Sequence, residues 1–139
     1  MDNVLLILKD ARSIVDTGFC KGAYAKRGNG LSCKPTDPRA VSHCTVGAIY
    51  AAAGLETIDG HDAVSWTKDV QTAVIEIHAA IGIRSYDEDA MATWNNRWYR
   101  SKRGVLRAFD RAIAFYESEQ ASVFASSEPK RLLIADAAE

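Results

Sequence analysis

Near the amino terminus, hydrophobic residues recur at intervals of three and four positions, which is the spacing of one face of an amphipathic helix. Charged and polar residues fill most of the positions between them. Asp2 suits the N-cap of such a helix, and Gly18 suits its end. The expected hydrophobic face is formed by Val4, Ile7, Leu8, Ala11, Ile14 and Val15.

Residues 19–36 lack this periodicity. Asn29-Gly30 is a strong signal for a type I′ turn, so the sequence predicts a short β-hairpin of about residues 22–27 against 31–35. Two strands alone are only marginally stable in water, so we expect this hairpin to pack on helices.

A second helix is predicted over residues 38–53, with Asp37 as its N-cap, Pro38 at its first position and Gly54 at its end. After His43 almost every residue is hydrophobic or small, as in a helix that is buried on all sides. We therefore expect this helix to form the centre of the fold. The residues expected to be inaccessible are Cys44, Ala48, Ala51 and Ala52.

Three more helices follow from the same periodicity. Their candidate N-caps are Asp62 or Ser65, then Ser85 or Asp87, and finally Ser101. Gly82 suits the end of the third helix, and His78 falls away from its hydrophobic face. The hydrophobic positions are Trp66, Val70, Ala73, Val74, Ile77 and Ile81, then Ala90, Met91 and Trp94, and then Val105, Leu106, Phe109, Ala112, Ile113 and Tyr116.

These elements predict a mainly α fold: a compact bundle of four to five helices around a buried central helix, with one small β-hairpin. We expect residues 1–120 to form a single globular helical domain. Residues 121–139 are expected to be a C-terminal appendage, either a short helix that starts near Pro129 or a flexible segment.

Composition narrows the function classes. The chain has 139 residues, 47% of them hydrophobic, and a net charge of −1, so it has no overall attraction to nucleic acid or membrane. No hydrophobic run approaches the roughly 20 residues of a membrane span. The three cysteines form an odd set without a secretory signal, which indicates free thiols and a cytoplasmic location.

The charges are nevertheless segregated. Residues 56–89 contain eight acidic and two basic residues, whereas residues 97–111 contain six basic and one acidic residue. Arg103, Arg107 and Arg111 lie four apart, on one face of the last predicted helix. This stripe is either a solvated face balanced by Asp110 and other acids, or a surface that attracts an anionic partner.

The stretch Trp-Asn-Asn-Arg-Trp-Tyr-Arg, residues 94–100, joins the last two predicted helices. Trp94 continues a hydrophobic face, and Asn95 or Asn96 suits a left-handed helix end. Trp98 lies outside any such face, and Trp, Tyr and Arg are enriched at binding hot spots. The alternative is a rigid turn held by large rings. The candidate binding residues are Asn95, Asn96, Trp98, Tyr99, Arg100, Arg103 and Arg107.

The cysteines allow a second hypothesis. A small cysteine-dependent enzyme would use Cys20 or Cys44 with a histidine such as His61 or His78. Zinc ligation is disfavoured because the sequence has no Cys-x2-Cys pair, and we expect neither a metal nor a cofactor. Gly28-Asn29-Gly30 lacks the Gly-Lys-Ser/Thr of a phosphate loop.

Several stretches together carry a family resemblance: Gly18–Ala23, Cys44-Thr45-Val46-Gly47-Ala48, Trp94-Asn95-Asn96, and the closing helix from Val105 to Ile113. Over residues 4–116 the chain resembles a family of small bacterial and phage domains of unknown function. That family has Asp at the position of Asn96. A role that needs an ionised carboxylate would be lost here, whereas a hydrogen-bonding role would survive.

The resemblance implies this layout and favours a phage or mobile-element origin, but it carries no activity. We therefore expect a non-catalytic binding or regulatory domain, encoded by a phage and acting on a host protein or a small anionic ligand. Nucleic acid is an alternative partner, because Arg and aromatic side chains also bind bases. A homo-oligomer that uses residues 121–139 is a further alternative, and no membrane contact is expected.

Overall fold

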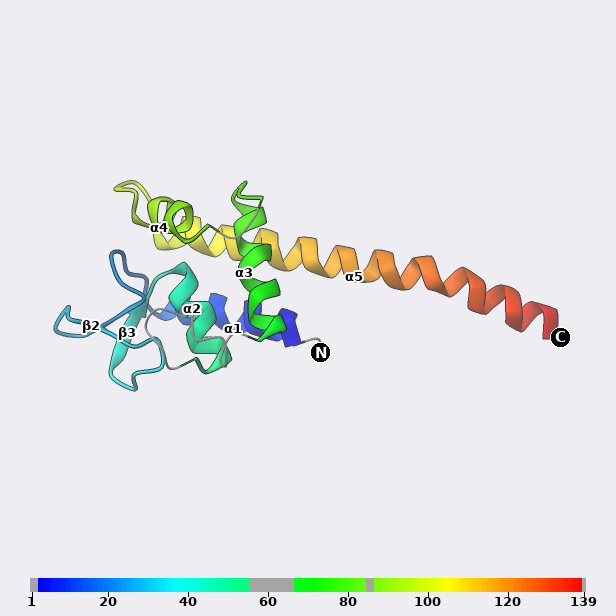
Figure 1. Ribbon diagram of the computed structural model, residues 1–139, viewed down its shortest axis with the longest axis horizontal. Coiled ribbons are helices and arrows are strands. Elements are labelled where there is room, and N and C mark those ends of the chain that lie inside the picture. Colours follow the sequence, from blue (N-terminus) through cyan, green and yellow to red (C-terminus); the bar gives the residue numbers. More distant parts are fainter. Residues whose placement is uncertain (1–2, 56–66, 85–86, 139) are drawn as a thin grey trace.

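The computed structural model describes residues 3–55, 67–84 and 87–138, and within them it is mainly helical (Figure 1). The helices are α1 (Asn3–Thr17), α2 (Thr45–Ala53), α3 (Lys68–Ala80), α4 (Glu88–Asn96) and α5 (Lys102–Ala138). The strands are β1 (Ala25–Arg27), β2 (Ser32–Cys33) and β3 (Ala40–His43). They form an antiparallel sheet in the order β2-β1-β3.

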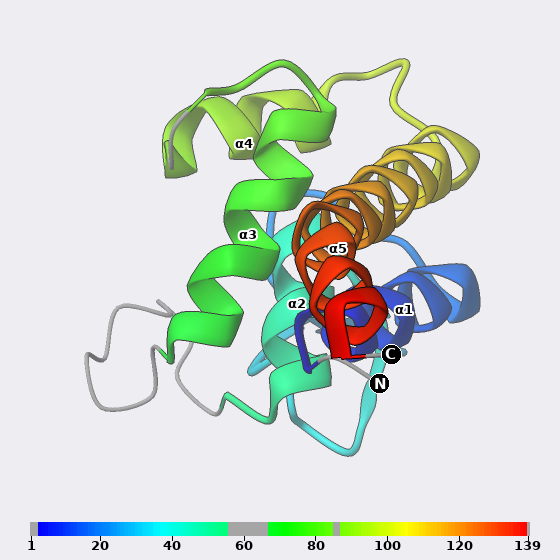
Figure 2. The same cartoon turned by 90° about the vertical axis from the view of Figure 1, so that its right-hand side faces the viewer.

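α1, α2, α3 and α5 enclose most of the core, and α4 lies at one end of α3 and contributes Met91 to it (Figure 2). α1 packs against α2, α3, α5 and β3, whereas the most extensive contacts of α2 are with α1, α3 and β3. The predicted arrangement around one central helix 38–53 is therefore not confirmed. α1 contacts at least as many elements as α2 does, because it packs both on α2 and β3 and on the later helices α3 and α5.

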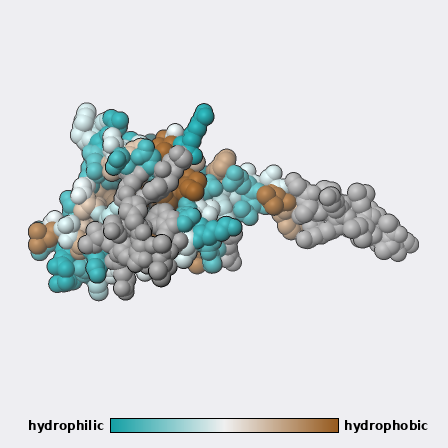
Figure 3. Space-filling model, viewed as in Figure 1, coloured by the Kyte–Doolittle hydropathy of each residue, from teal (hydrophilic) through white to brown (hydrophobic). Residues whose placement is uncertain are grey.

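α5 continues past the rest of the molecule (Figure 1). Residues 121–138 extend this helix without a break. Val123 and Phe124 are 66% and 61% exposed, and hydrophobic surface is visible on α5 next to its grey end (Figure 3). The division into a domain of residues 1–120 and an appendage stays a prediction.

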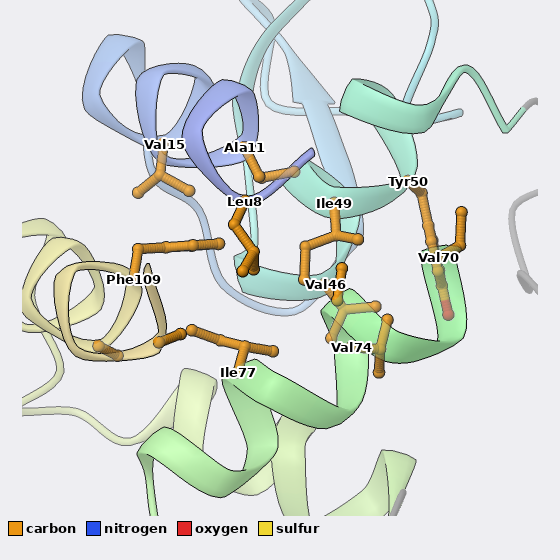
Figure 4. Packing of buried hydrophobic residues seen from close by; sticks show 14 of the residues in the cluster. Leu8, Ala11, Val15, Val46, Ile49, Tyr50, Val70, Val74, Ile77 and Phe109 are labelled. Atoms are coloured by element: carbon orange, nitrogen blue, oxygen red, sulfur yellow. The ribbon is translucent and has the colours of Figure 1, made fainter. Parts of the chain in front are cut away.

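The core is built from the predicted hydrophobic faces. Leu8 of α1 lies between Ile49 of α2, Ile77 of α3 and Phe109 of α5 (Figure 4), and all four side chains are fully buried. Burying such side chains stabilises the fold by about 1.5–3 kcal/mol each. The predicted faces of the first, third and last helices are thus confirmed among the described residues.

The hairpin is confirmed, but its turn is of another type. Ala25 pairs with Cys33 and Lys26 with Ser32. The Arg27 carbonyl accepts a hydrogen bond from the Gly30 amide, and within residues 28–30 of this turn only Gly30 has a positive φ, +84°. A type I′ turn would need positive φ at Asn29 as well. The loop is instead a three-residue connection in which the Asn29 side chain accepts from the Leu31 amide.

The predicted start of the second helix is wrong. Residues 40–43 form β3, which pairs with β1, and the helix starts only at Thr45 with Cys44 as its N-cap. Asp37 accepts from the Arg39 amide and binds Arg27, so it stabilises a turn rather than a helix end. Pairing with β1 outweighs the local Asp-Pro signal.

Burial in α2 also differs in part from the expectation. Ala48 is fully buried, but Ala51 and Ala52 are only partly buried, because the last turn of α2 approaches the surface. Cys44 is partly exposed as a residue, and its sulfur accepts a hydrogen bond from the Gly47 amide at 3.2 Å. Gly54 ends the helix with φ +75°, as predicted.

The third helix begins later than expected, at Lys68 with Thr67 as its N-cap. The predicted caps Asp62 and Ser65 and the hydrophobic Trp66 lie outside the described residues. His78 was expected to face away from the core, but it is fully buried. Its Nδ1 lies 2.6 Å from the Val74 carbonyl oxygen, which can only accept a hydrogen bond. That bond allows a polar ring to be buried in the helix face.

A carboxyl pair joins α3 to α5 and predicts a pH dependence of stability. Partial burial, followed by the charge of Glu119 and a hydrogen bond to it, raises the pKa of Glu76. A raised carboxyl pKa means that the folded state binds the proton more tightly. This contribution is fully present below the unfolded pKa and is lost as pH rises through the folded pKa.

We therefore expect Glu119→Gln to raise the free energy of unfolding at pH 7 by a few tenths of a kcal/mol, because it removes a like charge. The gain should shrink as pH falls through the raised pKa of Glu76. Glu117→Gln makes the same charge change on α5 and serves as the control. Thermal melts at pH 7 and pH 5 measure both; equal gains in the two variants would contradict the pairing.

Candidate functional site

The loop between α4 and α5 presents two aromatic rings to solvent. Trp98 is 90% exposed and Tyr99 is 55% exposed. The two rings meet edge to face, with centroids 5.6 Å apart. Edge-to-face contact is a favoured aromatic geometry, so each ring helps to orient the other. A solvent-facing tryptophan leaves a large hydrophobic surface without protein cover among the described residues.

The backbone beneath these rings is held in place. Lys21 Nζ donates to the carbonyl of Arg97 at 2.6 Å and to that of Trp98 at 3.4 Å. Arg100 Nε donates to the carbonyl of Trp94 at 3.0 Å, and its guanidinium lies 3.9 Å from the Trp94 ring centroid. Trp94 is partly buried against the core, in line with its predicted side of the helix. Arg100 therefore supports the loop, and Trp98 projects from it.

The arginine stripe continues from this loop along α5. Arg103 and Arg107 are exposed, and within the described part of the chain neither forms an ion pair. Asp110 is bound by Arg12 of α1, with Nη2 3.2 Å from Oδ2. Asp110 thus forms its ion pair with α1 rather than with the stripe. The two interpretations of the stripe, a solvated face or a surface for an anionic partner, both stay predictions. Exposed positive charge therefore follows the aromatic loop along the first turns of α5.

The position of Lys102 in the first turn of α5 has a structural explanation. A cation in the first turn of a helix is disfavoured by the helix dipole. Lys102 Nζ, however, donates to the Asp16 carbonyl at the end of α1 at 3.0 Å, and it lies 3.8 Å from the Asp16 carboxylate. It therefore joins two helix ends of opposite polarity.

Asn95 is not part of the exposed surface. It is 3% exposed, and its Oδ1 accepts from the Thr45 amide at 3.0 Å and from the Thr45 hydroxyl at 2.6 Å. Its Nδ2 donates to the Cys20 carbonyl at 3.3 Å and to Asn96 Oδ1 at 3.1 Å. The predicted left-handed helix end at an asparagine is wrong, since neither Asn95 nor Asn96 has a positive φ.

Asn96 acts as a hydrogen-bond acceptor. Its Oδ1 accepts from the Gly22 amide at 3.0 Å and from Asn95 Nδ2. An aspartate at this position could accept both bonds as well, so the contact that the structure shows does not require one residue type rather than the other. Asn95 and Asn96 together attach the end of α4 to the segment before β1 and to the start of α2.

A cavity of about 420 Å³ lies next to these asparagines. It is lined by residues 22–24, by β2, by the start of α2 and by the face of α4 that carries Met91, Ala92, Asn95 and Asn96. Sequence reasoning did not find this cavity. Its walls come from four separate stretches, and the only local signal was the glycine-rich segment around Gly22.

The surroundings of Cys20 and Cys44 do not favour the alternative hypothesis of a cysteine-dependent enzyme. Burial raises the pKa of Cys44 to about 12, and burial also raises the pKa of Cys20. A nucleophilic cysteine needs the opposite shift. His78 donates to its own helix, and His43 Nε2 lies 2.8 Å from the Pro35 carbonyl. His61 lies outside the described residues.

Comparison with known proteins identifies the family. Residues 1–115 match a family of unknown function, DUF6197. The chain belongs to this family. No curated protein and no solved structure matches the chain. Among the described residues, no helix is both long and hydrophobic enough to cross a membrane. Membership of this family covers residues 1–115 but assigns no function, so a function has to be inferred from the surface and the cavity described above.

Proposed function

We propose that this DUF6197 domain is a non-catalytic binding domain that recognises a protein partner through an exposed loop surface. The surface consists of Trp98 and Tyr99 on the loop and of Arg103 and Arg107 on the first turns of α5, which follows the loop. The observation that carries the proposal is the 90% exposure of Trp98 on a loop whose backbone is fastened by Lys21 and Arg100. A rigid aromatic anchor loses little conformational entropy on binding.

The chemistry of the surface indicates what it would bind. Exposed tryptophan and tyrosine bury large hydrophobic area in a partner, and unpaired arginines bind carboxylates. Arg103 and Arg107 are one helical turn apart on α5, so the surface extends along the helix. An acidic protein surface with a hydrophobic pocket covers such an extended area better than a small anion does. A host protein of a phage is one partner that would fit this proposal.

The stability of two variants tests whether the tryptophans differ in role. Trp98→Ala is expected to change the free energy of unfolding by less than about 0.5 kcal/mol, because the ring has little protein contact. Trp94→Ala should cost about 1–3 kcal/mol, below the cost for a fully buried ring, because Trp94 is only partly buried. Urea unfolding measures both. A large loss for Trp98→Ala would show that the loop serves only the fold.

Binding is tested by placing a photo-crosslinking phenylalanine analogue at position 98 of the full chain in its native cell. We expect a discrete protein adduct that weakens strongly with Arg103→Glu and Arg107→Glu. The matched control is the same analogue at Leu31, which is 61% exposed on the hairpin turn. Identical adducts at both positions, or crosslinks to nucleic acid alone, would contradict the proposal.

A further inference from the structure

The cavity beside Asn95 and Asn96 has the features of a small-molecule site. Its volume of about 420 Å³ falls within the range of about 300–1,000 Å³ that is typical of ligand pockets. Most of its wall is hydrophobic, from side chains such as Val46, Met91 and Ala92. Trp98 and Arg103 do not belong to its described lining.

The cavity is uncharged but has polar groups to offer. None of the described residues that line it carries a charged side chain. Asn96 Oδ1 is occupied by the Gly22 amide and by Asn95, whereas Asn96 Nδ2 donates to no described residue. The Ser32 hydroxyl likewise has no partner among the described residues. A bound molecule can therefore receive a hydrogen bond from Asn96 while its hydrophobic part lies against Met91 and Val46.

From this arrangement we propose that the cavity binds a small, uncharged, mainly hydrophobic organic molecule that carries one acceptor such as an amide or ketone carbonyl. An anionic molecule is disfavoured, since no cation among the described lining residues offsets its lost hydration. The site does not depend on the loop surface around Trp98. The two proposals can fail separately, because a ligand at each site perturbs different residues.

Acetanilide, a neutral aromatic amide, is a suitable probe, and benzoate is its anionic counterpart. We expect acetanilide to cause saturable ¹H–¹⁵N chemical-shift changes centred on Gly22, Ala92, Asn95 and Asn96. For a probe of this size the dissociation constant should be roughly millimolar. Benzoate should bind at least about tenfold more weakly at these residues.

Two tryptophan substitutions on α4 provide the matched comparison. Ala92 lines the cavity, whereas its neighbour Thr93 does not. Ala92→Trp should fill the space and weaken acetanilide binding at least about tenfold, and Thr93→Trp should leave it unchanged. Asn96→Asp keeps the acceptor for Gly22 but removes the Nδ2 donor, so it should weaken acetanilide binding several-fold. If Ala92→Trp fails to fold, Ala23→Leu narrows the cavity from another lining segment.

The proposal is overturned if acetanilide gives no saturable shifts, or if its shifts centre on Trp98 and Tyr99. Equal affinities for acetanilide and benzoate would also overturn it, as would undiminished binding to a folded Ala92→Trp variant. The shift map of the unmodified chain decides the location even when a variant is unstable. Perturbation confined to the cavity residues, with the loop surface unchanged, supports this site alone.

Discussion

Replacing Gly47 by alanine is expected to destabilise the protein severely, by roughly 3 kcal/mol or more. Gly47 lies in the first turn of α2, where the backbone of Tyr24 crosses the helix. A Cβ on Gly47 would lie 2.0 Å from the Tyr24 carbonyl oxygen and 2.7 Å from its carbonyl carbon. Both contacts are with backbone atoms, and the Tyr24 carbonyl also accepts from the Cys44 amide. Neither partner can move aside without breaking the junction of β1 with α2.

The predicted loss of stability for Gly47→Ala is opposite in sign to the usual effect of this substitution in a helix. In an ordinary helix, glycine to alanine stabilises by about 1 kcal/mol, because alanine has the higher helix propensity. Gly104, in the first turn of α5, is the matched control: its added Cβ would meet Ser101 Oγ at 3.6 Å and Arg100 Cδ at 3.7 Å, which are ordinary contacts. Gly104→Ala should therefore stabilise by about 0.5–1 kcal/mol.

Urea unfolding of Gly47→Ala and Gly104→Ala, followed by far-ultraviolet circular dichroism, measures both changes. We expect midpoints shifted in opposite directions relative to the unmodified chain. A Gly47→Ala protein as stable as the unmodified chain would mean that β1 and α2 do not approach as closely as described.

Asn95→Leu is expected to be the second most damaging substitution. Leucine has a similar size but cannot hydrogen-bond, so the Thr45 amide and the Cys20 carbonyl would lose their partner. Each buried, unsatisfied polar group costs roughly 1–3 kcal/mol, so the loss should be about 2–6 kcal/mol. Because these bonds attach α4 to α2, amide exchange should accelerate first in α4 and at the start of α2.

Asn96→Asp is the control for this prediction. It changes the neighbouring asparagine but preserves an acceptor for the Gly22 amide, so it should alter stability by less than about 0.5 kcal/mol. Thermal melts at pH 7 compare the two variants. Similar melting temperatures for Asn95→Leu and the unmodified chain would show that the buried amide is dispensable.

Local sequence was enough to place much of the helical framework. The hydrophobic faces of α1, α3 and α5 follow from spacing, since a helix must bury one side wherever it packs. The helix ends at Gly54 and Ser101 follow from capping chemistry, which involves only residues within one turn. For the loop surface, the same reasoning separated Trp94, on a hydrophobic face, from Trp98, which lies on none.

Contacts between distant residues decided the remaining features. Residues 40–43 follow the helix-start signal at Asp37-Pro38, yet they become β3 because they pair with β1 in the sheet. Asn95 resembles a helix-end residue, but its partners Thr45 and Cys20 are 50 and 75 positions away. Short-range patterns contain no information about such partners. The cavity likewise exists only where four distant stretches meet, because its volume is the space that their packing leaves unfilled.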